Sequence, residues 1–280
     1  MNRHVLRSLL ITLSVAIKPG ALHRLTLSGE FEQRLMELAE VLDPMEEAYR
    51  RGRNLALGKV TSQAMGLGQL VGRALRGAFD ASGLTPLTGL WTAGVVMSSI
   101  VGYADEAGIN LVDSLRTLVL RVLYGSSPAD AEELVSALAD VNDSDLVNYL
   151  MDKGITQNYI AMNSLTLGDL FENLYQVDLG FMLNLRSYQE LVRASKILAG
   201  SQDLTSGVVK AYMHLASPFM AADVREAVGQ GLDLKRLARL DKALEPMRGK
   251  YNRVLGGLFY SVVLGLAGGA PLAFSSLAPG

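Results

Sequence analysis

The sequence contains no cysteine and only three histidines among its 280 residues. The absence of cysteine excludes disulfides, thiolate metal sites and thiol nucleophiles. A multi-histidine zinc site would need His4, His23 and His214 to converge, which we do not expect. A chain without cysteine also fits a reducing compartment, and we predict a cytoplasmic protein.

An excess of charge of one sign is also missing. The chain carries 26 basic and 28 acidic residues, for a net charge of -2, and no basic block stands out. One Trp and seven Phe offer few platforms on which bases could stack. These features argue against nucleic-acid binding. A hydrophobic content of 49% with 19% charged residues excludes a disordered chain.

Signals for β-structure are absent as well. No stretch alternates convincingly between apolar and polar residues, and no Asn-Gly or Asp-Gly hairpin signal occurs. Helical periodicity and helix caps dominate instead, so the sequence predicts an all-α fold. Because we find neither a fixed-period repeat nor a Pro- or Ser-rich linker, we predict a single all-helical domain over residues 1–280.

Several helix boundaries can be predicted from their local signals. The pattern predicts a helix over 31–42, with Glu30 and Arg34 on its exposed face, and a new helix beginning at Pro44. Another helix is expected to span 179–198, the longest clean amphipathic segment. Asp143 and Asp145 are expected to be exposed residues at a helix end.

The segment 254–274 is uncharged and long enough to meet the criterion for a membrane span. It also contains Gly256, Gly257 and Gly265, and Pro271 interrupts its end. Small residues let helices approach closely in soluble cores as well as in lipid. We therefore predict a central buried helix, and a membrane span remains the alternative.

A rigid turn near the N-terminus brings cationic residues together. Pro19 presets its backbone angle, and Gly20 opens conformations that other residues avoid. Such a turn would direct Lys18, His23 and Arg24 toward a bound oxyanion, most naturally a phosphate. The alternative is a solvated connection whose basic residues face water.

Two nucleotide-binding motifs can be tested in the glycine-rich stretch that follows. The triplet Gly58-Lys59-Val60 lacks the hydroxyl that a phosphate-binding loop needs for magnesium. The glycines at 66, 68 and 72 miss the dinucleotide spacing by one, and no strand precedes them. Both motifs fail. The glycines are expected to permit close helix packing, with the backbone at Gly66 and Gly68 available to a ligand.

Residues 14–24, Ser-Val-Ala-Ile-Lys-Pro-Gly-Ala-Leu-His-Arg, resemble the first conserved block of the triphosphoribosyl-dephospho-CoA synthases, most closely the archaeal type. The resemblance covers about a tenth of the chain and extends to the layout of apolar, glycine-bearing helices. It implies transfer of triphosphoribose from ATP to the ribose hydroxyl of dephospho-CoA, with release of adenine. It also implies ATP and Mg²⁺ as cofactors, with Lys18 and Arg24 holding phosphate.

The sequence departs from that family at two motifs. The segment 63–68 lacks the family's Asn-Thr pair. Near the end, Asn252, Gly256 and Gly257 keep the family's asparagine and glycine but lose its Pro and Asp. Asn252 remains a candidate ligand-binding residue. The alternative function is a non-catalytic helical binding or assembly module that retains only the scaffold, with a homo-oligomer left open.

One pair of carboxylates is a candidate metal site. Asp169 and Glu172 lie three residues apart on a predicted helix and would share a magnesium ion through water. The alternative is that Asp169 forms a capping box with Thr166 and that both acids compensate the helix dipole.

Overall fold

The computed structural model describes residues 3–26, 29–220 and 233–270, and every regular element in these ranges is helical. The predicted all-α fold is therefore confirmed. The elements in chain order are α1 (Arg3–Ser14), α2 (Glu30–Ala56), α3 (Leu67–Ser82), α4 (Thr88–Ala107), α5 (Leu111–Val122), α6 (Pro128–Asp140), α7 (Ser144–Asp152), α8 (Gln157–Asn163), α9 (Leu167–Leu174), η1 (Leu179–Phe181), α10 (Tyr188–Ala199), α11 (Leu204–Ala216), η2 (Ser217–Phe219), α13 (Leu234–Leu244), η3 (Glu245–Met247), α14 (Arg248–Asn252) and α15 (Leu255–Ala267).

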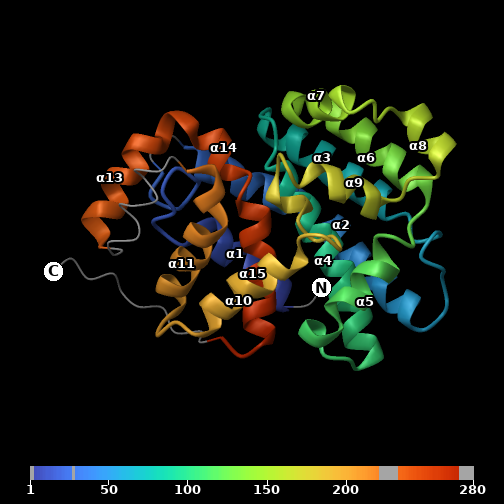
Figure 1. The fold of residues 1–280 in the computed structure, drawn as a ribbon, viewed down its shortest axis with the longest axis horizontal. Coiled ribbons are helices and arrows are strands. Elements are labelled where there is room, and N and C mark those ends of the chain that lie inside the picture. The colour runs from blue at the N-terminus through green and yellow to red at the C-terminus, as the bar shows by residue number, and fades with distance from the viewer. Residues whose placement is uncertain (1–2, 27–28, 221–232, 271–280) are drawn as a thin grey trace.

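The helices form two groups that meet along α4 and α15 (Figure 1). On one side α4 packs against α2 and α3, and α3 packs against α6. On the other side α15 packs against α1, α10 and α11. Helices α13 and α14 lie at the edge of the second group, beside the chain that follows α1. The single-domain prediction stays a prediction.

Helix α15 confirms the predicted buried glycine-rich helix near the C-terminus. Every residue from Leu255 to Leu266 is buried. The predicted apolar segment extends past residue 270, and that part lies outside the described residues. None of the helices in the described ranges combines the length and apolar character that a membrane crossing requires.

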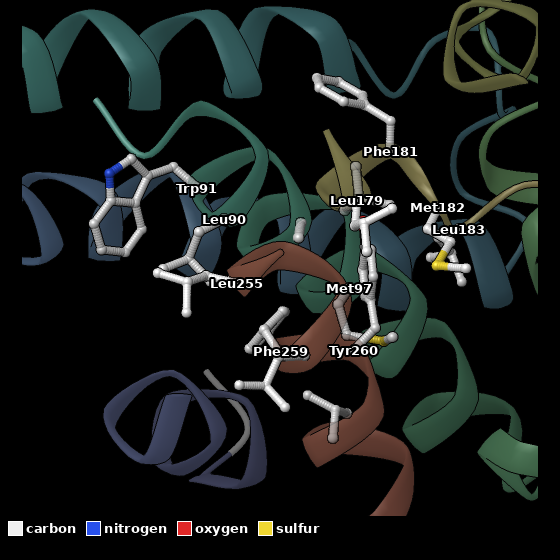
Figure 2. Packing of buried hydrophobic residues seen from close by; sticks show 14 of the residues in the cluster. Leu90, Trp91, Met97, Leu179, Phe181, Met182, Leu183, Leu255, Phe259 and Tyr260 are labelled. Atoms are coloured by element: carbon white, nitrogen blue, oxygen red, sulfur yellow. The ribbon is translucent and has the colours of Figure 1, made fainter. Parts of the chain in front are cut away.

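Three glycines explain how closely the two groups approach. A Cβ atom on Gly180 of η1 would lie 2.2 Å from Cα of Gly89 in α4, and one on Gly256 of α15 would lie 2.4 Å from Cα of Gly180. These backbones are therefore in direct contact, which only glycine allows. Figure 2 shows the apolar side chains that gather around this junction, among them Leu90, Trp91, Leu255, Phe259 and Tyr260.

Helix α2 differs from its prediction because Pro44 lies inside it, buried, and does not begin a new helix. An internal proline costs about 3 kcal/mol, because it removes one backbone hydrogen bond and crowds the preceding turn. The apolar stripe of Val41, Met45 and Ala48 continues across the proline and is fully buried. Each large side chain buried there contributes about 1.5–3 kcal/mol, so packing outweighs the local cost.

The predicted helix over 179–198 is also interrupted, with η1 at its start and α10 beginning only at Tyr188. Asn184 causes the break. Its Oδ1 accepts hydrogen bonds from the backbone N–H groups of Arg186 and Ser187 at 2.9 and 3.0 Å, and its Nδ2 donates to the Phe181 carbonyl at 3.0 Å. The side chain thus replaces helical backbone partners, as asparagine does in turns.

Candidate functional site

The predicted phosphate-binding turn, residues 18–24, holds its lysine side chain inside the protein. Lys18 is fully buried, and its Nζ donates to the carbonyls of Val15 and Leu13 at 2.5 and 3.4 Å, just past the end of α1 and at its last turn. Burial lowers the pKa of Lys18 from 10.5 to about 7, although the nearby Asp241 carboxylate opposes the shift. The lysine therefore satisfies carbonyls that the helix end leaves without partners.

Asp241 of α13 forms hydrogen bonds with two other residues of the turn, Gly20 and His23. One oxygen accepts the Gly20 N–H at 2.9 Å, and the other lies 3.1 Å from His23 Nε2. Since the Leu25 N–H donates to His23 Nδ1, the proton is assigned to Nε2, which donates to Asp241. Burial alone would raise the pKa of the Asp241 carboxyl, but these hydrogen bonds hold it below its ordinary value.

Arg24 and Asn252 lie on either side of this closed turn. Arg24 is exposed and forms no hydrogen bond or ion pair with the part of the chain that the structure describes. Asn252 at the end of α14 accepts the Leu22 N–H at 2.8 Å through Oδ1. The structure therefore brings Asn252 together with the turn. The phosphate contacts of Lys18, Gly20, His23 and Arg24 stay predictions.

Gly66 and Gly68 lie at the start of α3 and serve helix packing. Gly66 precedes the helix with a φ of 57°, and its carbonyl lies 3.4 Å from Arg51 Nη1. The Gly68 N–H donates to Asp130 Oδ1 at 2.7 Å, and a Cβ atom there would lie 2.0 Å from the Asp130 carbonyl oxygen. Gly68 thus lets α3 contact α6, as predicted, and its amide already has a partner.

The carboxylates of Asp169 and Glu172 both have protein partners. Asp169 forms the predicted capping box, accepting from the Thr166 backbone and hydroxyl at 2.8 and 2.7 Å. Glu172 accepts a short hydrogen bond from the Tyr124 hydroxyl and pairs with Arg186 at 2.6 Å. Within the described ranges, no group of three or more acidic or histidine side chains is placed to hold a metal ion.

A cleft of about 430 Å³ lies next to Asn252. It is lined by Glu30 and Arg34 of α2, by the segments 84–88 and 142–145, by Asp178, and by Arg248, Gly249, Asn252 and Arg253. We refer to it as the cleft. Its volume falls within the range of about 300–1,000 Å³ typical of small-molecule sites.

Three helices of at least 9 residues begin at the cleft. Glu30, Thr88 and Ser144 are the first residues of α2, α4 and α7, and all three line it. Each helix N-terminus carries a partial positive charge of about +0.5, which favours an anionic ligand, although the Asp143 carboxylate already caps the terminus of α7.

One wall of the cleft is built on a buried ion pair. The Glu37 carboxylate is fully buried and accepts from Trp91 Nε1 at 2.7 Å, from the Ser82 hydroxyl at 2.8 Å, and from Arg34. Arg34 also donates to the Thr85 carbonyl at 3.1 Å. The prediction that Arg34 is exposed was wrong. Its side chain is 8% exposed, because Glu37 neutralises it within the fold.

A second wall is acidic and is organised by Arg253. Its guanidinium lies 2.8 Å from Asp143, 3.0 Å from Asp145 and 3.3 Å from Asp178. Asp143 was predicted to be exposed but is buried, since Arg253 supplies its counter-charge; Asp145 is exposed as predicted. Burial raises the pKa of Asp178 from 3.8 to about 6, although Arg253 opposes the shift.

Sequence reasoning missed Arg34, Glu37 and Asp178 as site residues. The spacing of Glu30, Arg34 and Glu37 was a usable signal, since residues three and four apart share a helix face. Nothing local marked this face as buried, because its partners Trp91 and Thr85 come from another part of the chain.

No family model matches this sequence, and no curated protein matches it. Among solved structures, the fold is similar to that of a chain described as a putative triphosphoribosyl-dephospho-CoA synthase from Archaeoglobus fulgidus. The TM-score is 0.55 at 17% sequence identity, and the match covers 82% of this chain and 97% of that chain. At this identity the likeness shows the fold, which is the one that residues 14–24 led us to expect.

Proposed function

We propose that this protein is a transferase-like protein that binds a phosphate-bearing small molecule of the nucleotide or CoA class in the cleft. The observation that carries the proposal is the convergence of three helix N-termini with Arg34, Arg248 and Asn252 on one cavity. This arrangement suits phosphate groups, because helix N-termini and guanidinium groups both bind oxyanions. The fold shared with the putative synthase supports the same ligand class.

Asp178 gives the acidic wall a role in the reaction that the resemblance implies. The hydroxyl of dephospho-CoA would attack the ribose carbon of ATP that bears adenine, and that carbon–nitrogen bond would break with its electron pair leaving on adenine. Asp178 would take the hydroxyl proton, and the departing adenine would take a proton from solvent. A carboxyl group with a pKa of about 6 is suited to accept that proton near neutral pH.

The two cofactors that the resemblance implies fit this chain differently. The phosphates of ATP match the hydrogen-bond donors of Arg34, Arg248 and Asn252. Mg²⁺ does not fit between Asp169 and Glu172, because their carboxylates are committed to Thr166, Tyr124 and Arg186. We assign no protein ligand to Mg²⁺ and no step through it.

The test is to incubate the protein with ATP and dephospho-CoA and to measure released adenine by chromatography, with and without MgCl₂. Titration calorimetry with each compound measures binding separately. We expect binding of at least one compound and adenine release that falls about 100-fold or more in Asp178→Asn. Lys250→Ala is the matched control, since Lys250 is exposed on α14 and does not line the cleft.

The outcomes separate the two candidate functions. Binding without adenine release would favour the non-catalytic helical module that keeps the ligand site. Failure of both compounds to bind would overturn the proposal.

A further inference from the structure

We propose that, in the free protein, the Glu30 carboxylate occupies the position of the ligand's phosphate. A phosphate group then binds by displacing this carboxylate from between Arg34, Arg248 and Asn252. This inference rests on the proposed function in placing a phosphate in the cleft, and it names the position and the competing group.

The contacts of Glu30 are numerous but long. Arg34 Nη2 lies 3.3 Å from Glu30 Oε1, Asn252 Nδ2 lies 3.4 Å from the same oxygen, and Arg248 Nη1 lies 3.8 Å from Oε2. Well-formed charge-assisted hydrogen bonds measure about 2.7–2.9 Å. Three donors from two helices therefore surround an anion position that a two-oxygen carboxylate fills incompletely. A phosphate offers more acceptor oxygens.

Two of the three donors, Arg34 and Asn252, are held in place independently of Glu30. Glu37 and the Thr85 carbonyl fix Arg34, as described above. The Leu22 N–H fixes the amide of Asn252, because it donates to Oδ1 and so directs Nδ2 toward Glu30. Donors positioned by the fold bind an anion without the cost of ordering them at that moment.

The two arginines also carry unused donors. The Nε atoms of Arg34 and Arg248 are buried and have no hydrogen-bond partner among the described residues. A buried donor without a partner is costly, particularly on a charged group. Arg34 is 6% exposed and lines the cleft. A ligand with additional oxygen atoms would satisfy donors that Glu30 leaves unpaired.

The experiment measures inorganic pyrophosphate binding by titration calorimetry to the wild type and to Glu30→Gln. Removal of the competing charge should tighten binding about tenfold or more. Glu32→Gln is the matched control, because Glu32 is exposed in the same first turn of α2 and does not line the cleft. It removes the same charge from the same helix terminus and should leave affinity unchanged. Adding Arg248→Ala to Glu30→Gln should reverse the gain.

Equal or weaker pyrophosphate binding by Glu30→Gln would overturn the inference, and so would no binding by either protein. A gain with pyrophosphate when neither ATP nor dephospho-CoA binds would support the inference and count against the proposed function. If the wild type binds a nucleotide but Glu30→Gln does not bind pyrophosphate more tightly, the proposed function is supported and the inference about Glu30 is overturned. Circular dichroism of both variants verifies the fold.

Discussion

The turn at 18–24 and the cleft both concentrate charged groups, yet they use them in opposite ways. In the turn, Lys18 and His23 are buried and hydrogen-bonded within the protein, and Asp241 holds the Gly20 amide. In the cleft, the Nε atoms of Arg34 and Arg248 have no partner among the described residues, and both arginines contact Glu30 at long distances.

This difference in hydrogen bonding indicates which region contributes to stability and which contributes to ligand binding. Groups whose hydrogen bonds are complete inside the fold stabilise it and have little left to offer a ligand. Groups that the fold holds in place but leaves incompletely paired can gain from a ligand. Substitutions in the turn should therefore change the free energy of unfolding, whereas substitutions at the surface of the cleft should change ligand affinity.

The largest effect is expected at Glu37, beneath the cleft. There one substitution should change both the free energy of unfolding and ligand affinity, so the separation between the two regions should not hold. Glu37→Gln would leave the buried Arg34 charge with only its long contact to Glu30, so we expect a loss of about 4 kcal/mol in the free energy of unfolding, together with weaker pyrophosphate binding. Urea denaturation measures the loss. Glu40→Gln on the exposed side of α2 is the control and should change stability by less than about 0.5 kcal/mol. Equal effects in the two variants would contradict the role of Glu37.

The next effect concerns the turn itself. Gly20 has a φ of 79°, and a Cβ atom there would lie 2.7 Å from Tyr251 Cδ2 and 2.8 Å from Leu244 Cβ. Gly20→Ala should lower the free energy of unfolding by about 3 kcal/mol, from backbone strain plus overpacking. Gly29→Ala shares the positive φ, 71°, but meets nothing within 4 Å, so it isolates the strain at about 1 kcal/mol. Similar losses at both positions would show that the turn is not packed as described.

A pH dependence should distinguish the acidic wall of the cleft. The pKa of Asp178 is about 6 in the folded protein, above its ordinary value of 3.8, so folding disfavours the ionised form. Its favourable contribution is complete below the ordinary value and is lost as pH rises through about 6. Asp178→Asn should therefore gain stability relative to the wild type between about pH 4 and 6. A carboxyl titration by NMR with a midpoint near 4 would contradict this.

The smallest effect is expected where α13 meets the turn. Asp241→Asn would place an amide donor opposite the His23 N–H and should cost about 1 kcal/mol at neutral pH. Because the folded pKa of Asp241 is depressed, the stability that it contributes is present above its ordinary value of 3.8 and lost at lower pH. The difference between variant and wild type should therefore shrink below about pH 4. Lys242→Ala, exposed on the same helix, is the control.

The sequence predicted the features that depend on local chemistry. The capping box of Thr166 and Asp169 and the buried helix α15 follow from residues near one another in the chain, and both are confirmed. The interruption at Asn184 and the continuity of α2 through Pro44 depend on contacts that no local pattern records.

The cleft could not be predicted from the sequence, because it too depends on contacts between distant parts of the chain. Its donors include Arg34 and Asn252, which are more than two hundred residues apart in the sequence. Arg34 is buried against Glu37, and Trp91 donates to the same carboxylate. The cations of the turn could be identified from the sequence because they are close together in it. Adjacency shows that charges are close to one another, but it does not show whether their hydrogen bonds are already satisfied.

The most direct test compares one arginine from each region. Pyrophosphate is titrated by calorimetry into the wild type, Arg24→Ala and Arg248→Ala, all verified as folded by circular dichroism. Both variants remove one guanidinium charge. Arg24 is exposed on the turn and Arg248 lines the cleft, so the charge is removed from a different region in each variant. We predict that Arg248→Ala weakens binding about tenfold while Arg24→Ala binds as the wild type does. Weakened binding in Arg24→Ala with none in Arg248→Ala would place the phosphate at the turn and contradict this account.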